Sequence, residues 1–382
     1  MDLFTNNVLI YKMVLFKPVV LVFLGVFYCW GCKPAGSLKG SATFPVEISA
    51  DKGIEVSGLK VLSRLTGSSI PGENYPNSGL TAQYGVGGTD LGILWTMADG
   101  RTGIFFGDTY GHDFKPGKGG PEDASEWRNN VLAFTSDKNL EDGLDIDEMI
   151  TDKNGHAVEV LTKSPRGHTA IPTGAISIKG VEYVHYFDLK SWTNWVTNFS
   201  SIYRSSDTGK TWQACPQVMF KRNSKFSIVA YASKDKWNYM IGGASLRKSP
   251  PYLARFRDED ILNQKEYQYW NNVKGWVKGN EDAATAIFPG PIGEGSLIYN
   301  QEFKRWIFIY LNDKGRQIEM RDADEITGPW SVAKPVMLAR DYPGLYGPFI
   351  HPQSDGKDLY FTMSQWRPYN VFFMKATLKL SN

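Results

Sequence analysis

The chain has 382 residues, including 12 Trp, 19 Tyr, 21 Phe, 38 Gly and 20 Pro, and its 42 basic and 40 acidic side chains leave a net charge of +2. This aromatic, Gly-rich composition is typical of many short strands joined by tight turns, and a balanced charge without a basic block argues against a nucleic-acid-binding protein. The length allows one large all-β domain or two ordinary domains.

The first 31 residues are predicted to be a secretory signal. Lys17 precedes an apolar run over residues 19–28, and this run has the length of a signal-peptide core and is too short to cross a bilayer. We therefore exclude residues 1–31 from the fold and expect the remaining chain to be exported.

The end of the signal resembles a relaxed bacterial lipoprotein cleavage site, because Gly31 precedes Cys32. We expect Cys32 to be the lipidated first residue of a protein of the outer membrane or cell surface, or one that faces the periplasm. Ordinary secretion with cleavage near Ala35 is the alternative. Residues 32–54 are rich in Gly, Ser and Ala and are predicted to be a flexible tether. Cys215 is then the only remaining thiol, which excludes a disulfide framework.

A hairpin is predicted at the start of the folded domain. Apolar runs over residues 91–97 and 102–106 flank Asp99-Gly100, and Asp-Gly between apolar strands is a strong hairpin signal. Asp90 and Asp108 are equidistant from the turn, so we expect them to be cross-strand neighbours roughly 5 Å apart. A carboxylate pair this close raises one pKa, so one group can act as a general acid while the other stays ionised. Asp residues at strand ends also cap turns, which is the alternative interpretation.

The hairpin begins the first of five similar units. Each unit has a Gly-flanked opening strand, an aromatic-rich second strand and one or two outer strands, and such a repeat predicts an all-β fold, a five-bladed β-propeller over residues 55–382. The opening strands are expected over residues 91–97, 171–178, 226–231, 295–299 and 347–351. Short helical turns are expected near residues 258–263 and 323–326.

Residues 205–212 match the Asp-box, S-x-D-x-G-x-T-W, at every fixed position. In this motif the Asp and Gly shape a tight turn between the outer strands of a blade, and the Trp packs beneath the turn. The motif indicates a propeller and carries no catalytic role.

Motifs for metal or nucleotide sites are weak. The acidic residues 141–148 lack the ligand spacing of a calcium loop and are interpreted as a solvated connection. His351 is expected in the core more than in a central channel, and no paired-His motif for zinc occurs. We predict no metal and no cofactor.

Several polar and aromatic residues are candidates for binding sugars. Glu294 opens the fourth unit, at the position equivalent to Asp90 in the first, and is either a substrate ligand, an acid or a turn residue. Asn130 and Gln365 are candidate hydrogen-bonding residues. Aromatic residues outside the strand runs are candidates for stacking on sugar rings, with a core role as the alternative: Trp127, Trp192, Trp195, Tyr346 and Trp366.

Five stretches carry a resemblance to a known family: Gly88-Thr-Asp-Leu-Gly92, Phe106-Gly-Asp-Thr109, Trp127-Arg-Asn-Asn-Val-Leu-Ala133, Glu294-Gly-Ser-Leu297 and Ser364-Gln-Trp366. They resemble the signatures of glycoside hydrolase family 183, bacterial five-bladed propellers that were formerly catalogued as a domain of unknown function and are assigned as endo-D-arabinanases. The resemblance covers the chain from about residue 60 to its end. The resemblance implies cleavage inside α-linked D-arabinofuranose chains such as those of mycobacterial arabinogalactan and lipoarabinomannan, with Asp90 and Asp108 as the acidic pair.

We therefore expect a glycoside hydrolase that acts on a polysaccharide with Asp90 and Asp108. The predicted substrate-binding residues are Asn130, Glu294, Tyr346, Gln365 and Trp366. The protein is expected to be a monomer that meets the membrane only through its lipid. The alternatives are a non-catalytic surface glycan-binding propeller and a propeller glycosidase for another furanoside. A sialidase is disfavoured because we identify no arginine cluster that would clamp a carboxylate substrate.

Overall fold

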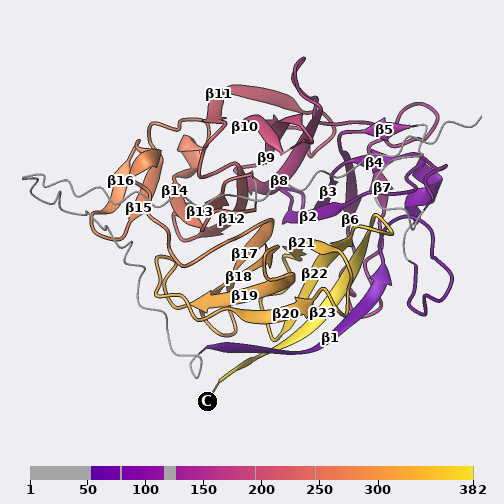
Figure 1. Ribbon diagram of the computed structural model, residues 1–382. Helices are drawn as coiled ribbons and strands as arrows, with labels where there is room; N and C mark the ends of the chain where they lie inside the picture. Colours follow the sequence, from indigo (N-terminus) through magenta and orange to yellow (C-terminus); the bar gives the residue numbers. More distant parts are fainter. Residues whose placement is uncertain (1–52, 78–79, 116–125, 194, 246, 382) are drawn as a thin grey trace, which may run out of the picture. The chain divides into compact units, whose positions relative to one another are not determined.

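The computed structural model describes residues 53–381 except 78–79, 116–125, 194 and 246; Cys32, the predicted signal and nearly all of the predicted tether lie outside these residues. The described residues form five main antiparallel sheets arranged as the blades of a propeller (Figure 1), which confirms the predicted fold. A two-stranded sheet of β4 (Thr109–Tyr110) and β5 (Trp127–Arg128) accompanies the first blade.

The blades follow the chain in order, each with its innermost strand first. Blade 1 contains β2 (Leu91–Thr96), β3 (Thr102–Phe106), β6 (Val131–Thr135) and β7 (Glu148–Met149). Blade 2 contains β8 (Thr169–Ile178), β9 (Val181–Ser191), β10 (Val196–Ser205) and β11 (Gln213–Lys221). Blade 3 contains β12 (Ile228–Lys234), β13 (Trp237–Gly243), β14 (Tyr252–Phe256), β15 (Gln268–Asn271) and β16 (Gly275–Lys278).

Blade 4 contains β17 (Gly295–Asn300), β18 (Arg305–Asn312), β19 (Gln317–Ala323) and β20 (Lys334–Leu338). Blade 5 contains β21 (Leu345–Ile350), β22 (Asp358–Gln365), β23 (Asn370–Leu380) and, outermost, β1 (Ile54–Arg64). The innermost strands β2, β8, β12, β17 and β21 each contact the next, and β21 contacts β2 again, so the ring is closed.

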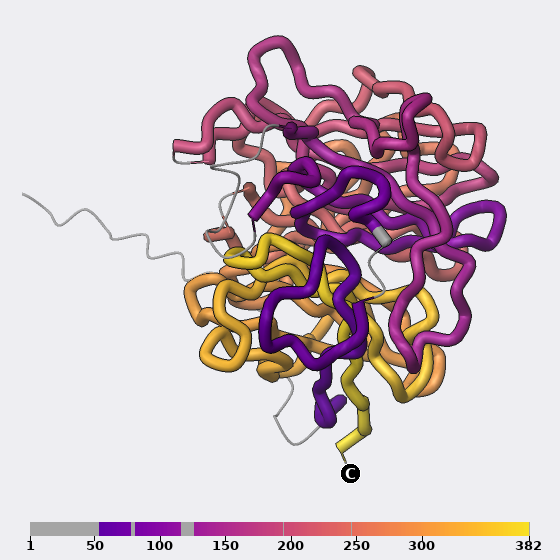
Figure 2. The backbone as a smooth tube through the Cα atoms, turned by 90° about the vertical axis from the view of Figure 1, so that its right-hand side faces the viewer, coloured from indigo at the N-terminus to yellow at the C-terminus, as the bar shows by residue number. Residues whose placement is uncertain are grey.

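Strand β1 joins the two ends of the domain and was not among the predicted strands. It pairs with β23 along its length, with Ile54 opposite Leu380, and the start of β1 and the end of β23 lie close together in Figures 1 and 2. The backbone N–H of Ile54 also donates a 3.1 Å hydrogen bond to Asp322 Oδ1 in blade 4. The N-terminal strand therefore completes the last blade and ties it to its neighbour.

The cavity lies on the opposite face of the ring from the start of β1 and the end of β23. Strand β23 begins at Asn370, directly after the cavity-lining Tyr369, and ends at Leu380. Because β1 is antiparallel to β23, Ile54 lies beside Leu380 at the far end. The chain therefore enters the propeller on the face away from the cavity.

The Asp-box has the predicted structural role. Asp207 accepts hydrogen bonds from the backbone and the hydroxyl of Thr211, at 2.9 and 2.6 Å, which closes the turn between β10 and β11. The indole N–H of Trp212 donates to Gly209 O at 2.9 Å, and its ring packs edge-on against Phe105 of blade 1. The motif thereby joins blades 1 and 2.

Two smaller predictions have mixed outcomes. The short helix Asp258–Asp260 is confirmed, but residues 323–326 end β19 and continue as a bend and turn, because the loop folds back so that Ser331 N donates to Asp322 O at 2.8 Å. The short helices Leu80–Tyr84 and Glu281–Ala283 were not predicted. His351 is fully buried with its ring against Phe373, and it does not line the cavity.

Candidate active site

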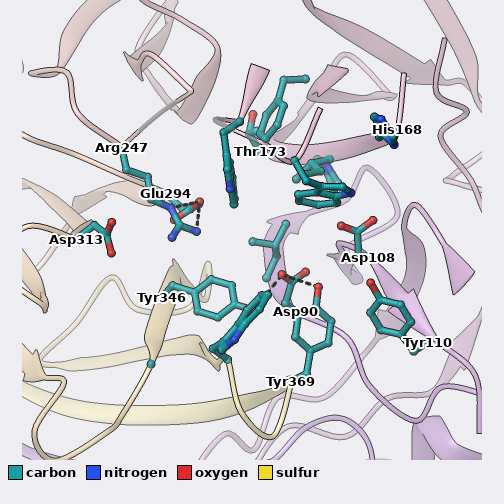
Figure 3. Close-up of a pocket in the computed structure, with 18 of the residues that line it drawn as sticks. Asp90, Asp108, Tyr110, His168, Thr173, Arg247, Glu294, Asp313, Tyr346 and Tyr369 are labelled. Atoms are coloured by element: carbon teal, nitrogen blue, oxygen red, sulfur yellow. Dashed lines mark hydrogen bonds and ion pairs between the residues drawn. The ribbon is translucent and has the colours of Figure 1, made fainter. Parts of the chain in front are cut away.

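A cavity of about 920 Å³ opens where the innermost strands begin (Figure 3). Its charged lining residues are Asp90, Asp108, Lys163, Arg247, Glu294 and Asp313. Its aromatic lining residues are Tyr110, Trp127, Phe187, Trp192, Trp195, Tyr346, Trp366 and Tyr369. Concave sites with apolar walls and a few convergent polar groups are the usual form of small-molecule and sugar sites.

Asp90 and Asp108 both line this cavity, but they are not directly opposed as predicted. The register shifts by one residue between Leu91 and Ile93, so that Gly107 N donates to Asp90 O at 3.0 Å and Asp108 lies one position further. The cause is a bulge: Leu91 and Gly92 have φ angles of 67° and 84°. Gly92 is the sequence signal for it, because a glycine inside a strand pattern is typical of a bulge.

The carboxyl group of Asp90 is held by two tyrosines. Its Oδ2 accepts hydrogen bonds from Tyr346 at 3.0 Å and Tyr369 at 3.2 Å, while Oδ1 is buried with no hydrogen-bond partner among the described residues. Burial raises the pKa of Asp90 to about 7, against the opposing effect of the two hydroxyl groups. Oδ1 lies over Gly107, where a Cβ atom would overlap it, so a glycine is required there.

The carboxyl group of Asp108 is held by a hydroxyl and an indole. Its Oδ1 accepts hydrogen bonds from Thr169 at 2.7 Å and from Trp127 Nε1 at 3.2 Å. Burial, followed by the charge of Asp90, raises the pKa of Asp108 well above its ordinary value. Because the Asp90 carboxylate favours the protonated form of Asp108, the pair can present one ionised and one protonated group.

A third carboxyl group lies on another wall of the cavity. Glu294 immediately precedes β17, as Asp90 precedes β2, and its Oε1 accepts hydrogen bonds from Arg247 Nε at 3.0 Å and Nη2 at 2.8 Å. Its charge raises the pKa of Asp90, although burial has the larger effect. Arg247 was not predicted, because a single arginine in a loop belongs to no motif.

All five predicted stacking residues line the cavity: Trp127, Trp192, Trp195, Tyr346 and Trp366. Three of these residues are well exposed: Trp127 at 37%, Trp192 at 44% and Trp366 at 50%. Large apolar side chains left this exposed beside a cavity are suited to stacking on a ligand ring.

Two predicted substrate-binding residues do not line the cavity. Asn130 is fully buried, and its amide makes four hydrogen bonds of 2.8–3.1 Å to the backbone of Val160, Leu161 and Ala170. Asn130 therefore holds the segment that leads into β8 and has no group left for a sugar. Gln365 is not a lining residue, and its amide donates to Pro343 O at 3.3 Å.

The described residues contain no group of three or more His, Cys, Asp or Glu side chains arranged to hold a metal ion. In the same part of the chain, no helix is long and apolar enough to cross a membrane.

Comparisons with known proteins give a family and relatives. The family model described as "Domain of unknown function (DUF4185)" matches residues 77–375. Notoamide biosynthesis cluster protein J of Aspergillus sp. (strain MF297-2) is 28% identical over 313 residues, covering 74% of this chain and 81% of that protein. Notoamide biosynthesis cluster protein J' of Aspergillus versicolor is 28% identical over 307 residues, covering 74% and 82%.

Among solved structures, a protein of Bacteroides ovatus ATCC 8483 that is provisionally called a hydrolase aligns with a TM-score of 0.57 and 12% identity. The alignment covers 88% of this chain and 97% of the Bacteroides chain. At this identity the likeness shows a shared fold alone.

Proposed function

We propose that this chain, which belongs to the family described as Domain of unknown function (DUF4185), is a glycoside hydrolase that cleaves internal α-D-arabinofuranosyl linkages of D-arabinan. The observation that carries the proposal is the pair of buried carboxyl groups, Asp90 and Asp108, on one cavity rimmed by exposed tryptophans. Glycosidases use two carboxyl groups in different protonation states on either side of the scissile bond.

Burial and then the charge of Asp90 raise the pKa of Asp108, so we assign the proton to Asp108 and the negative charge to Asp90. Asp108 keeps its proton and donates it to the leaving glycosidic oxygen as the C–O bond breaks. Asp90 ionises first, with a pKa of about 7, and its carboxylate either removes a proton from the attacking water or attacks the anomeric carbon. The two routes give products of opposite anomeric configuration, and the anomer first released distinguishes them.

The substrate class rests on the resemblance to endo-D-arabinanases. Each of the five stretches that carry the resemblance contributes a lining residue to this one cavity: Asp90, Asp108, Trp127, Glu294 and Trp366. They come from blades 1, 4 and 5 and from the connections next to those blades. Motifs scattered over more than two hundred residues therefore meet around a single ligand site, which supports carrying over the family's substrate.

The proposal includes a lipid anchor at Cys32, in a protein of the outer membrane or cell surface. The entry of the chain at Ile54, on the face opposite the cavity, supports this arrangement because it leaves the cavity open to a polymer in solution.

The test is to incubate the purified domain with D-arabinan, L-arabinan and xylan and to analyse the oligosaccharides released. Release of D-arabino-oligosaccharides of several lengths is expected. Release of a monosaccharide alone, or of products from another polymer alone, would refute the stated linkage. A complete lack of hydrolysis combined with tight glycan binding would favour the alternative, a non-catalytic glycan-binding propeller, which the exposed tryptophans would also suit.

A further inference from the structure

We propose that Arg247 and Glu294 form a binding site for two adjacent hydroxyl groups of an uncharged sugar, on a wall of the cavity separate from Asp108 (Figure 3). The inference rests on the proposed function, because it assigns the part of that cavity that recognises the sugar. It gives the Arg247–Glu294 pair a positioning and specificity role apart from the chemical step.

The Arg247–Glu294 pair has hydrogen-bond donors and an acceptor that it does not use within the pair. Nε and Nη2 of Arg247 both donate to Glu294 Oε1, whereas Glu294 Oε2 is buried and has no hydrogen-bond partner among the described residues. Only 10% of the Glu294 side chain is exposed, so an unmet acceptor there is costly until a ligand supplies a donor. A guanidinium carries five N–H groups, so donors for a second hydroxyl lie beside that acceptor.

The pair is also held in place before any ligand arrives. The guanidinium of Arg247 lies 5.0 Å from the ring centroid of Trp195 and 5.5 Å from that of Tyr346. Gly293 leaves room for the arginine stem, since a Cβ at that position would lie 3.2 Å from Arg247 Cγ. A planar guanidinium held against two aromatic rings binds two adjacent hydroxyl groups with little further ordering.

The charge of the cavity selects against anionic ligands. The lining holds the acidic residues Asp90, Glu294 and Asp313, with Asp108 kept protonated, and the basic residues Lys163 and Arg247 together with His168. The charge of Arg247 is already matched by Glu294, with Asp313 also close enough to stabilise it. A phosphate or uronate bound here would lie near the carboxylates of Glu294 and Asp313, and the positive charge of Arg247 is already paired with Glu294. A neutral diol would instead find one hydrogen-bond acceptor and one donor.

The experiment measures binding to the Asp108→Asn protein, so that no probe is cleaved. The probes are methyl α-D-arabinofuranoside and its 2-deoxy and 3-deoxy analogues. One of the two deoxy analogues is expected to bind about tenfold or more weakly than the parent, because it leaves a charged group unpaired. Adding Glu294→Gln or Arg247→Lys should weaken binding of the parent glycoside. It should also reduce the ratio of the dissociation constants, deoxy analogue to parent glycoside, to about threefold or less. Adding Lys163→Met, which removes the other lining cation, should leave the ratio unchanged.

Several results would overturn the site. The first is an unchanged ratio in both the Glu294→Gln and the Arg247→Lys variants, provided that their thermal unfolding matches that of the parent protein. The second is no measurable binding of the parent glycoside. The third is tighter binding of inorganic phosphate or D-glucuronate than of the parent glycoside. The proposed function is tested separately. If the pair variants lose discrimination but the protein does not hydrolyse D-arabinan, the proposed hydrolase function is wrong and the proposed sugar site stands. If the protein hydrolyses D-arabinan but the ratio is unchanged in the pair variants, the hydrolase function stands and the sugar site is wrong.

Discussion

The backbone N–H of Leu91 in blade 1 donates a 2.8 Å hydrogen bond to Ser364 Oγ in blade 5. Leu91 has a φ of 67°, a left-handed conformation that costs a branched L-residue about 1–2 kcal/mol. The hydroxyl of Thr362 donates to the carbonyl of the next residue, Gly92, at 2.8 Å. Strand β22 therefore holds the bulge that directs Asp90 into the cavity.

Ser364→Ala should reduce kcat about tenfold or more while KM stays nearly constant, because the bulge loses its anchor and Asp90 shifts. The unpaired N–H should also lower the free energy of unfolding by about 1–3 kcal/mol. Ser354→Ala is the matched control, since this buried serine bonds the backbone of Tyr360 at 2.9 and 3.0 Å and does not line the cavity. Equal effects of both variants on kcat would show that the anchor has no positioning role.

Gly107→Ala should lower kcat/KM about a hundredfold, because the added Cβ would overlap Asp90 Oδ1 and displace the carboxyl group. Gly356→Ala adds the same methyl group where nothing lies within 4 Å and should be silent. The measurement is steady-state kinetics of both variants. Full activity of Gly107→Ala would mean that the position of Asp90 does not limit the reaction.

The pH profile of kcat/KM should rise as Asp90 loses its proton, with an apparent pKa of about 7, and fall when Asp108 loses its own. The Tyr369 hydroxyl bonds Asp90 Oδ2 at 3.2 Å and favours the ionised form. Tyr369→Phe should therefore raise the pKa of Asp90 and move the acid limb to higher pH, by up to about one unit. Tyr84→Phe, whose hydroxyl bonds Asp147 O away from the cavity, should leave the limb in place. An unchanged acid limb together with a shifted alkaline limb in Tyr369→Phe would reverse the assigned roles.

Trp366→Ala should raise KM about three- to tenfold and leave kcat nearly unchanged, since the half-exposed indole offers a stacking face and touches no reacting group. Met219→Ala removes an equally exposed apolar side chain on β11 that does not line the cavity, and KM should not change. If KM is also unchanged in Trp366→Ala, the substrate does not stack on Trp366.

The order of the strands could be predicted from the sequence because each blade is formed by one continuous stretch of chain. The alternation of apolar and polar residues, the aromatic content and the turn residues that identify a blade all lie within that stretch. Strand β1 could not, because its partner β23 lies some three hundred residues further along the chain. The one-residue shift beside Asp90 was missed for a related reason, since the groups that stabilise the bulge, Thr362 and Ser364, belong to another blade.

The candidate site was predictable where a residue is placed by its own strand. Asp90, Asp108 and Glu294 all lie at strand ends that a turn or a glycine marks. The role of Asn130 depends on which backbone groups face it, and those are thirty and more residues away. Arg247 is similar, because its partner Glu294 lies 47 residues further on.

The central claim is that Asp90 and Asp108 together cleave a glycosidic bond. The most direct measurement is hydrolysis of D-arabinan by Asp90→Asn and Asp108→Asn, with binding of the intact polymer measured on the same preparations. We predict that each variant loses at least about a hundredfold in product formation and still binds the polymer. Unchanged turnover in both variants would contradict the account.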